Sequence, residues 1–385
     1  MPATYHCFML SRHGDKKIQN KLVAKEMRHF FNDLPRDVRE DHESAAKVYA
    51  KYLTGFHGSG FLRSERLRDE KKITRSRYYI GLSSDTIGLS ALSKRATLIT
   101  DTLLLTDDKS HDLHVLFESS DDRVTGVSVM NEFALESFAN GPDRYTNRRV
   151  AMACSDLAEL GRWILDAEPL LRAGLAWYLP RYFTARQRVE DDTASEWSAY
   201  GPSEMAGAVD YLIADGRAVD ASGASPEKSQ IVRPILEVEL PFIDGVDLPT
   251  FAKITVDEFN SYVGFRNFLR GKFLELEEGM NATQSQRALD RISVEILDQI
   301  HAITAEMNGV RRNRAVAATT AGVGTVSAIL AAVYGPALQE VIQMIGASGG
   351  AWGILNAMAQ NSPKSKFKDN KWYYVWALQR EAQRI

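Results

Sequence analysis

The chain has 385 residues, of which 44% are hydrophobic and 25% are charged. These are the values of an ordinary globular protein, so they exclude a disordered chain, a collagen-like repeat and a small disulfide-rich fold. The formal net charge of −3 makes nucleic acid an unlikely obligate partner, although a local basic patch leaves such a contact open.

The first part of the chain is predicted to form a mixed α/β domain over residues 1–186. Helical spacing of apolar residues and β-rich runs predict its elements in chain order. They are a strand over 5–10, helices over 15–34 and 36–54, a buried strand over 97–105, a hairpin of 113–118 with 123–129, a helix capped by Ser155, and a helix opened by Pro169.

Residues 187–230 are predicted to form a polar linker. Turn-forming and charged residues dominate 187–202 and 215–230, which leaves little apolar surface to bury. A short helix is expected between them, over 203–214.

The remaining residues, 231–385, are predicted to form a mainly helical domain, which makes the fold class α+β. Leu236, Val238 and Leu240 alternate with glutamates, a pattern typical of one strand with a buried face. Two antiparallel helices should follow. The first should begin at a Thr255–Glu258 capping box and end near Gly279. The second should begin after Asn281 and end at a C-cap formed by Gly309.

An uncharged, Gly/Ala-rich helical hairpin is predicted over 315–359, with Gly335–Pro336 as its turn. The only charge from 315 to 363 is Glu340, and basic residues flank both ends. Small side chains let helices approach closely, either in a soluble core or oligomer contact or in a bilayer. The contact residues expected on either interpretation are Gly346, Gly349, Gly350, Trp352 and Gly353.

The aromatic run 372–376 also allows two interpretations. It would form an interfacial belt at a membrane, or it would cover one end of a helical bundle. Low cysteine content and an N-terminus unlike a secretory signal favour a cytoplasmic location, with membrane association as an alternative.

One catalytic candidate follows the first predicted strand. Arg12-His13-Gly14 resembles the opening of the histidine phosphatase superfamily, in which the histidine is phosphorylated and the arginine holds phosphate. The resemblance implies a phosphohydrolase with His13 as nucleophile and Arg12 as phosphate clamp. Lys16 departs from the family's usual Thr or Ser, and the second histidine that the family needs has no clear match. A surface histidine at a turn is the alternative.

His111 and His114 are weak metal candidates, because imidazole beside carboxylates is a zinc-type ligand set. A polar turn before the hairpin explains these residues better, so no metal is predicted. The segment 63–77 carries an excess of basic side chains and is a candidate contact for an anionic partner. Its basic residues in this hypothesis are Arg63, Arg66, Lys71, Lys72, Arg75 and Arg77.

These observations predict a protein that acts by assembly or partner binding through its helical half and not by catalysis. A protein partner or a homo-oligomer is expected, and no cofactor is predicted, because no complete catalytic constellation is found. Membrane insertion of 315–359 and phosphohydrolase activity are the alternative functions.

Overall fold

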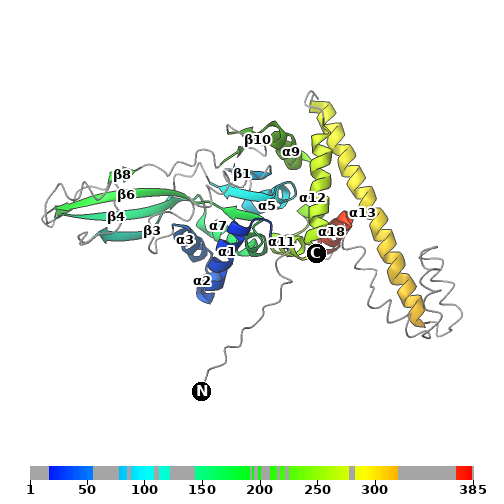
Figure 1. Cartoon of the computed structure of the whole chain (residues 1–385), viewed down its shortest axis with the longest axis horizontal. Helices are drawn as coiled ribbons and strands as arrows, with labels where there is room; N and C mark the ends of the chain where they lie inside the picture. Colours follow the sequence, from blue (N-terminus) through cyan, green and yellow to red (C-terminus); the bar gives the residue numbers. More distant parts are fainter. Residues whose placement is uncertain are drawn as a thin grey trace, which may run out of the picture.

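The computed structural model describes a mixed α/β region followed by a mainly helical region, which confirms the predicted fold class. A central body carries an extended β-sheet arm at one end and the long helix α13 at the other (Figure 1). The residues that the structure describes are 17–54, 78–84, 88–107, 112–121, 144–190, 193–194, 198–200, 209–214, 217–221, 225–276, 282–319 and 370–383.

The body is built on a five-stranded sheet. In spatial order its strands are β10 (Arg217–Asp220), β9 (Tyr211–Ala214), β1 (Tyr79–Ser84), β2 (Thr102–Thr106) and β5 (Ala176–Tyr178). β1 runs parallel to both β9 and β2, β2 runs parallel to β5, and β10 is antiparallel to β9. Every residue of β2 is buried, as expected of an apolar central strand in a parallel sheet.

Helices surround this sheet. Those before the helical half are α1 (Lys21–Asp33), α2 (Arg36–Glu40), α3 (His42–Leu53), α5 (Leu89–Thr97), α7 (Leu157–Asp166) and α8 (Glu168–Arg172). The single helix predicted over 36–54 is divided, because Asp41 adopts an extended conformation and its side chain accepts a hydrogen bond from the Glu43 backbone. The predicted helix over 15–34 begins at Lys21, because Asn20 caps it.

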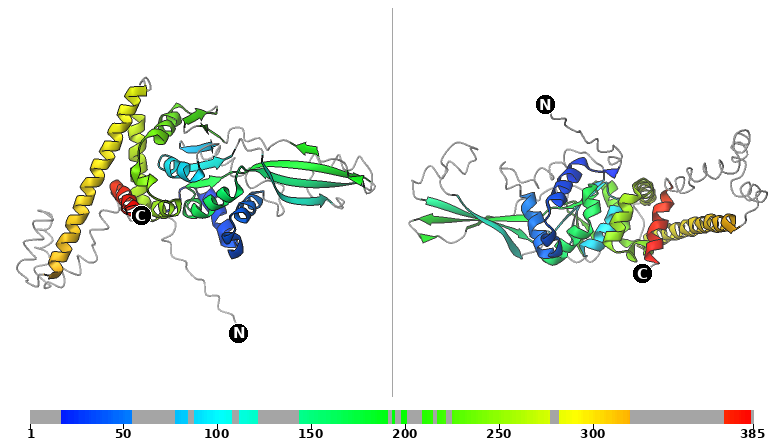
Figure 2. Two further views of the ribbon diagram at one scale, coloured as in Figure 1. Left: turned by 180° about the vertical axis from the view of Figure 1, so that it is seen from behind. Right: turned by 90° about the horizontal axis from the view of Figure 1, so that it is seen from below.

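The arm is a second, antiparallel sheet that projects from the body in every view (Figures 1 and 2). Its strands are β3 (Leu113–Asp121), β4 (Arg144–Ala153), β6 (Arg181–Glu190), β7 (Thr193–Ala194) and β8 (Ser198–Tyr200). The predicted turn after 118 is wrong, because β3 continues to Asp121 and pairs with β4. The second strand of the predicted hairpin, 123–129, lies outside the described residues, as does the predicted strand 5–10.

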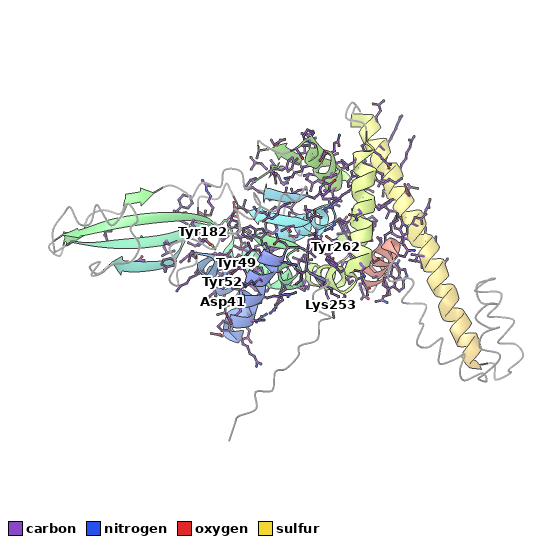
Figure 3. The ribbon with its side chains drawn as sticks, in the orientation of Figure 1. Asp41, Tyr49, Tyr52, Tyr182, Lys253 and Tyr262 are labelled. Atoms are coloured by element: carbon purple, nitrogen blue, oxygen red, sulfur yellow. The ribbon has the colours of Figure 1, made fainter. Side chains whose placement is uncertain are left out.

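Buried tyrosines join the arm to the body (Figure 3). Tyr49 donates a hydrogen bond to the carbonyl of Tyr178 at 2.8 Å, and Tyr182 donates one to the carbonyl of Ala50 at 2.8 Å. Burial raises the pKa of all three tyrosines, so these hydroxyls stay protonated donors. Helix α3 is thereby attached to β5 and β6.

The helical half packs on the body through α12. Its elements are α9 (Pro226–Glu237), α10 (Pro241–Asp244), α11 (Leu248–Asp257), α12 (Phe259–Leu274), α13 (Ala282–Thr319) and α18 (Lys371–Ala382). Tyr262, Arg266 and Arg270 lie one turn apart on α12 and donate to the carbonyls of residues 97, 100 and 99. These three side chains therefore satisfy carbonyl groups at the end of α5.

The aromatic run 372–376 lies on helix α18. Residues 372–378 are buried, and α18 packs against both α12 and α13 in the angle between them (Figure 1). Of the two interpretations of this run, covering the bundle is the one that this packing bears out. α12 and α13 run antiparallel, as predicted, and an ion pair of 2.8 Å between Lys272 and Glu295 joins them.

Several predictions for short segments are wrong. The helix expected over 203–214 is replaced at its end by strand β9, and the expected linker 215–230 contains β10 and the start of α9. The strand expected at 236–240 is instead the end of α9 followed by irregular chain, where Val238 and Leu240 are still buried. The domain boundaries themselves stay predictions.

Three predicted helix ends are also wrong. The cap of α7 is Asp156 and not Ser155, whose backbone and hydroxyl bind Asp107 instead. Thr255 lies inside α11, where its hydroxyl donates to the carbonyl of Phe251, and Gly309 lies inside α13. The strand expected from residue 97 begins at Thr102, because α5 extends to Thr97.

No helix among the described residues is long and apolar enough to cross a membrane. Residues 315–319 form the end of α13. The rest of the predicted hairpin, with all of its five expected contact residues, lies outside the described residues, so its insertion or assembly stays a prediction.

Candidate anion site on helix α1

Most side chains singled out in the sequence lie outside the described residues. These are Arg12, His13, His111 and the basic residues of 63–77. His114 lies on β3, with its Nε2 2.9 Å from the carbonyl oxygen of Cys154. Within the described ranges, no group of three histidine, cysteine or acidic residues could hold a metal ion, and His111 lies outside those ranges. Cys154 is buried, and burial raises the pKa of its thiol to about 12, as expected of a structural cysteine.

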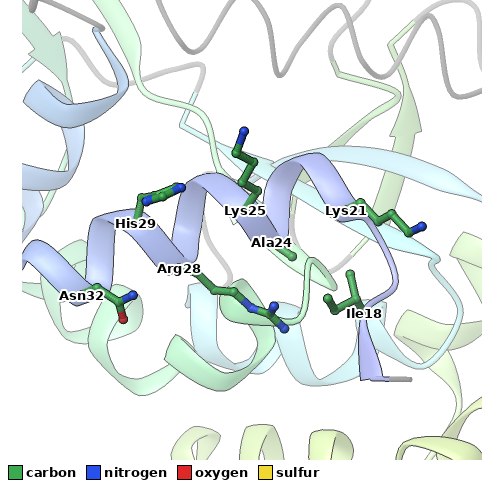
Figure 4. A pocket seen from close by; sticks show the side chains of 7 residues that line it. All are labelled: Ile18, Lys21, Ala24, Lys25, Arg28, His29 and Asn32. Atoms are coloured by element: carbon green, nitrogen blue, oxygen red, sulfur yellow. The ribbon is translucent and has the colours of Figure 1, made fainter. Parts of the chain in front are cut away.

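A half-open cavity of about 480 Å³ lies along one face of α1 (Figure 4). The residues that line it are Ile18, Lys21, Ala24, Lys25, Arg28, His29 and Asn32.

The amphipathic sequence of α1 produces this face. Val23, Met27 and Phe30 are fully or almost fully buried against the body. Lys21, Lys25, Arg28 and Asn32 follow one another at spacings of four and three residues, so they form a polar stripe along the helix. The Asn20 side chain accepts hydrogen bonds from the backbone of residues 22 and 23, which fixes where the helix and its stripe begin.

Arg28 is held in place by α8. Its Nε donates to the carbonyl oxygen of Arg172 at 3.1 Å. A guanidinium has five N–H donors, so this contact leaves four of them for a ligand. Holding one edge of the planar group also reduces the conformational entropy that ligand binding would cost.

Asn32 is also oriented by Arg172. The Arg172 Nη1 donates to Asn32 Oδ1 at 2.9 Å. This contact fixes the amide plane, and the amide nitrogen of Asn32 remains as a donor for a ligand. The amide orientation is assigned from this hydrogen bond.

Arg172 itself is fixed by two further contacts. Its Nε donates to Glu168 Oε1 at 2.6 Å, while the other oxygen of Glu168 accepts from Arg39 at 2.8 Å. Its guanidinium also lies 5.4 Å from the centre of the Phe31 ring. The contacts behind the cavity therefore form a network that joins α1, α2 and α8.

The cavity carries positive charge and hydrogen-bond donors. Lys21 and Lys25 are exposed and make no ion pair with another described residue, and none of the described lining residues is acidic. With Arg28 they supply three cations, to which His29 adds an imidazole. Such a set favours an anion with several acceptor oxygens.

The sequence contains a signal for this site. The predicted helix over 15–34 has its apolar stripe opposite a basic stripe of spacing i, i+4, i+7, and only the apolar stripe entered the prediction. Compared with family models, curated proteins and solved structures, the chain has no significant match, so its own geometry is the basis for interpreting the site.

Proposed function

We propose that this protein binds a phosphate-bearing ligand in the cavity on α1. The observation that carries the proposal is the set of positioned donors, Arg28 and Asn32, beside two lysines and without an acidic residue among the described lining residues. A phosphate group offers up to three free oxygens and two negative charges, which suit a guanidinium and two ammonium groups better than a carboxylate does.

The test is calorimetric titration of the full chain with inorganic phosphate and pyrophosphate at constant ionic strength. Lys25→Gln removes one cation from the cavity, and Lys253→Gln removes an exposed lysine from α11 as the matched control. Lys25 is exposed, and an exposed ionic contact contributes about 0.5–1 kcal/mol, so Lys25→Gln should weaken binding about two- to fivefold. The control should bind like the wild type.

Two outcomes would overturn the proposal. Wild-type protein would show no binding beyond that of chloride at the same ionic strength. Alternatively, Lys25→Gln and Lys253→Gln would weaken binding equally, which would indicate a diffuse charge effect instead of a site.

Partner binding is a second candidate function, and a different observation favours it. Among the described residues, the exposed large apolar side chains include Leu113 and Val115 on β3 and Val219 on β10, which are 51%, 46% and 51% exposed. Both strands lie at the edge of a sheet, where an added strand can pair. The double variant Leu113→Lys, Val115→Lys should reduce the mass measured by light scattering if this edge mediates assembly, and an unchanged mass would argue against it.

A further inference from the structure

A row of four residues crosses the β-sheet arm and contains two arginines but no acidic residue. Arg148 of β4 lies directly opposite Arg186 of β6. In the neighbouring strands, Ser119 of β3 lies opposite Arg148, and Ser198 of β8 lies opposite Arg186. Residues directly opposite each other in a sheet lie on the same face, so these four residues form one row on one face, which we call the arginine row.

The arginine row departs from the charge pairing of its neighbours. Three other arginines of the arm share a row with an acidic residue; the pairs are Arg149 with Glu118, Arg144 with Glu190, and Arg188 with Asp121. The first of these is an ion pair with an N–O distance of 2.6 Å. Like charges directly opposite each other destabilise a sheet, so the arginine row has a cost to the fold that an anionic partner would offset.

Helix α3 adds a third cation beside the arginine row. The next row on the same face contains Phe117 opposite Val150, which is buried. The Lys51 side chain of α3 is exposed, and its Nζ lies 6.0 Å from the centre of the Phe117 ring. Neighbouring rows on one face of a sheet are about 7 Å apart, so Lys51 and the arginine row can contact the same ligand.

The residue types in the row favour phosphate groups. Every basic residue of β4 and β6 is an arginine. A guanidinium binds two phosphate oxygens in a fork, and a serine hydroxyl can donate to a further oxygen. Arginine and serine are also typical of protein contacts to nucleic-acid phosphates. A peptide carboxylate has only two oxygens and would use fewer of these donors.

The position of the row favours an extended ligand. The arm projects from the body in every view (Figures 1 and 2). β4 and β6 are each ten residues long, which corresponds to about 34 Å. A strand of duplex DNA carries one negative charge for about every 3.4 Å of the helix axis, so it can meet several cations of the arm at once.

We propose that the arginine row, together with Lys51, is a contact surface for the phosphate backbone of a nucleic acid. The contact is electrostatic and does not depend on base sequence. The surface shares no residue with the cavity on α1, so this inference goes beyond the proposed function and is tested independently of it.

The experiment is fluorescence anisotropy of the full chain with a labelled DNA duplex of about 20 base pairs, at several salt concentrations. The row variant, Arg148→Gln with Arg186→Gln, removes both cations of the row. The matched control, Arg287→Gln with Arg291→Gln, makes the same change in net charge at exposed positions of α13.

The row variant should bind the duplex about five- to thirtyfold more weakly, as expected for two lost ionic contacts. The slope of log affinity against log salt should become less steep by about 1.8. The control should bind within about twofold of wild type. Lys51→Gln is a second variant, outside the sheet, and should weaken binding about two- to fivefold.

Urea unfolding checks that the row variant is folded. Its urea midpoint should equal or exceed that of wild type, because two like charges that lie opposite each other have been removed.

Three results would overturn the proposal. In the first, wild-type protein shows no salt-dependent binding of the duplex. In the second, the row variant and the control weaken binding equally, which indicates a diffuse charge effect. In the third, a labelled polyglutamate peptide binds as tightly as the duplex and loses as much affinity in the row variant, which assigns the surface to an acidic protein.

Discussion

Replacement of Gly174 by alanine tests the contact between α8 and α1. Gly174 has a φ of +70°, a conformation that costs a residue with a Cβ about 1–2 kcal/mol. An added Cβ would also collide with the backbone of Asn20, whose side chain caps α1. Displacing that cap costs about 1 kcal/mol more, so Gly174→Ala should lower the free energy of unfolding by about 2–3 kcal/mol.

Urea unfolding followed by circular dichroism measures this change, and Gly271→Ala is the matched control. A Cβ on Gly271 meets no other atom within 4 Å, and the residue lies in α12. Alanine there should raise the free energy of unfolding by about 0.5–1 kcal/mol, because it is the better helix former. A Gly174→Ala protein within about 0.5 kcal/mol of wild type would refute the role assigned to this turn.

Two further predictions concern buried charge and pH. Asp101 forms an ion pair with Arg266 at 3.2 Å and accepts a hydrogen bond from Arg270 at 2.9 Å. Asp101→Asn should lower the free energy of unfolding by about 3–5 kcal/mol in the same urea assay, because two buried cations lose their carboxylate. Burial raises the pKa of Cys154 to about 12 and raises the pKa of the core tyrosines, so the folded state favours their neutral forms. The stability that these groups contribute is complete below their unfolded pKa and is lost as the pH rises towards 12. Cys154→Ala should therefore reduce the slope of the free energy of unfolding against pH above about pH 9. An unchanged slope would contradict this prediction.

The sequence predicted long helices better than short elements, for a physical reason. In α13 a stripe from Leu289 to Ile303 repeats over several turns, and all of its members are buried in the structure. Over 236–240 the alternation covers only five residues, and it coincides with the end of a helix. Strand β9 could not be predicted because its strand conformation depends on pairing with β1, which lies far away in the sequence.

The candidate site could likewise be predicted only in part from the sequence. The basic stripe of α1 is local, so its spacing can be found in the sequence. The partners that orient it cannot be found there, because Arg172 lies 140 residues from Asn32 and belongs to a helix of only five residues. Motifs such as Arg12–His13 attracted the catalytic interpretation because they are contiguous, whereas donor orientation depends on tertiary contacts.

Stability and ligand binding should be coupled through the turn at 172–174. Gln19 donates to the carbonyl of Ala173 at 2.9 Å, so the same turn that orients the donors in the cavity also holds the chain just before α1. A variant that disturbs the backbone of this turn should lower both the free energy of unfolding and anion affinity. Arg172→Met keeps the backbone, so a change in anion affinity with little change in unfolding free energy separates the guanidinium's effect on Asn32 from the support that the turn gives to α1.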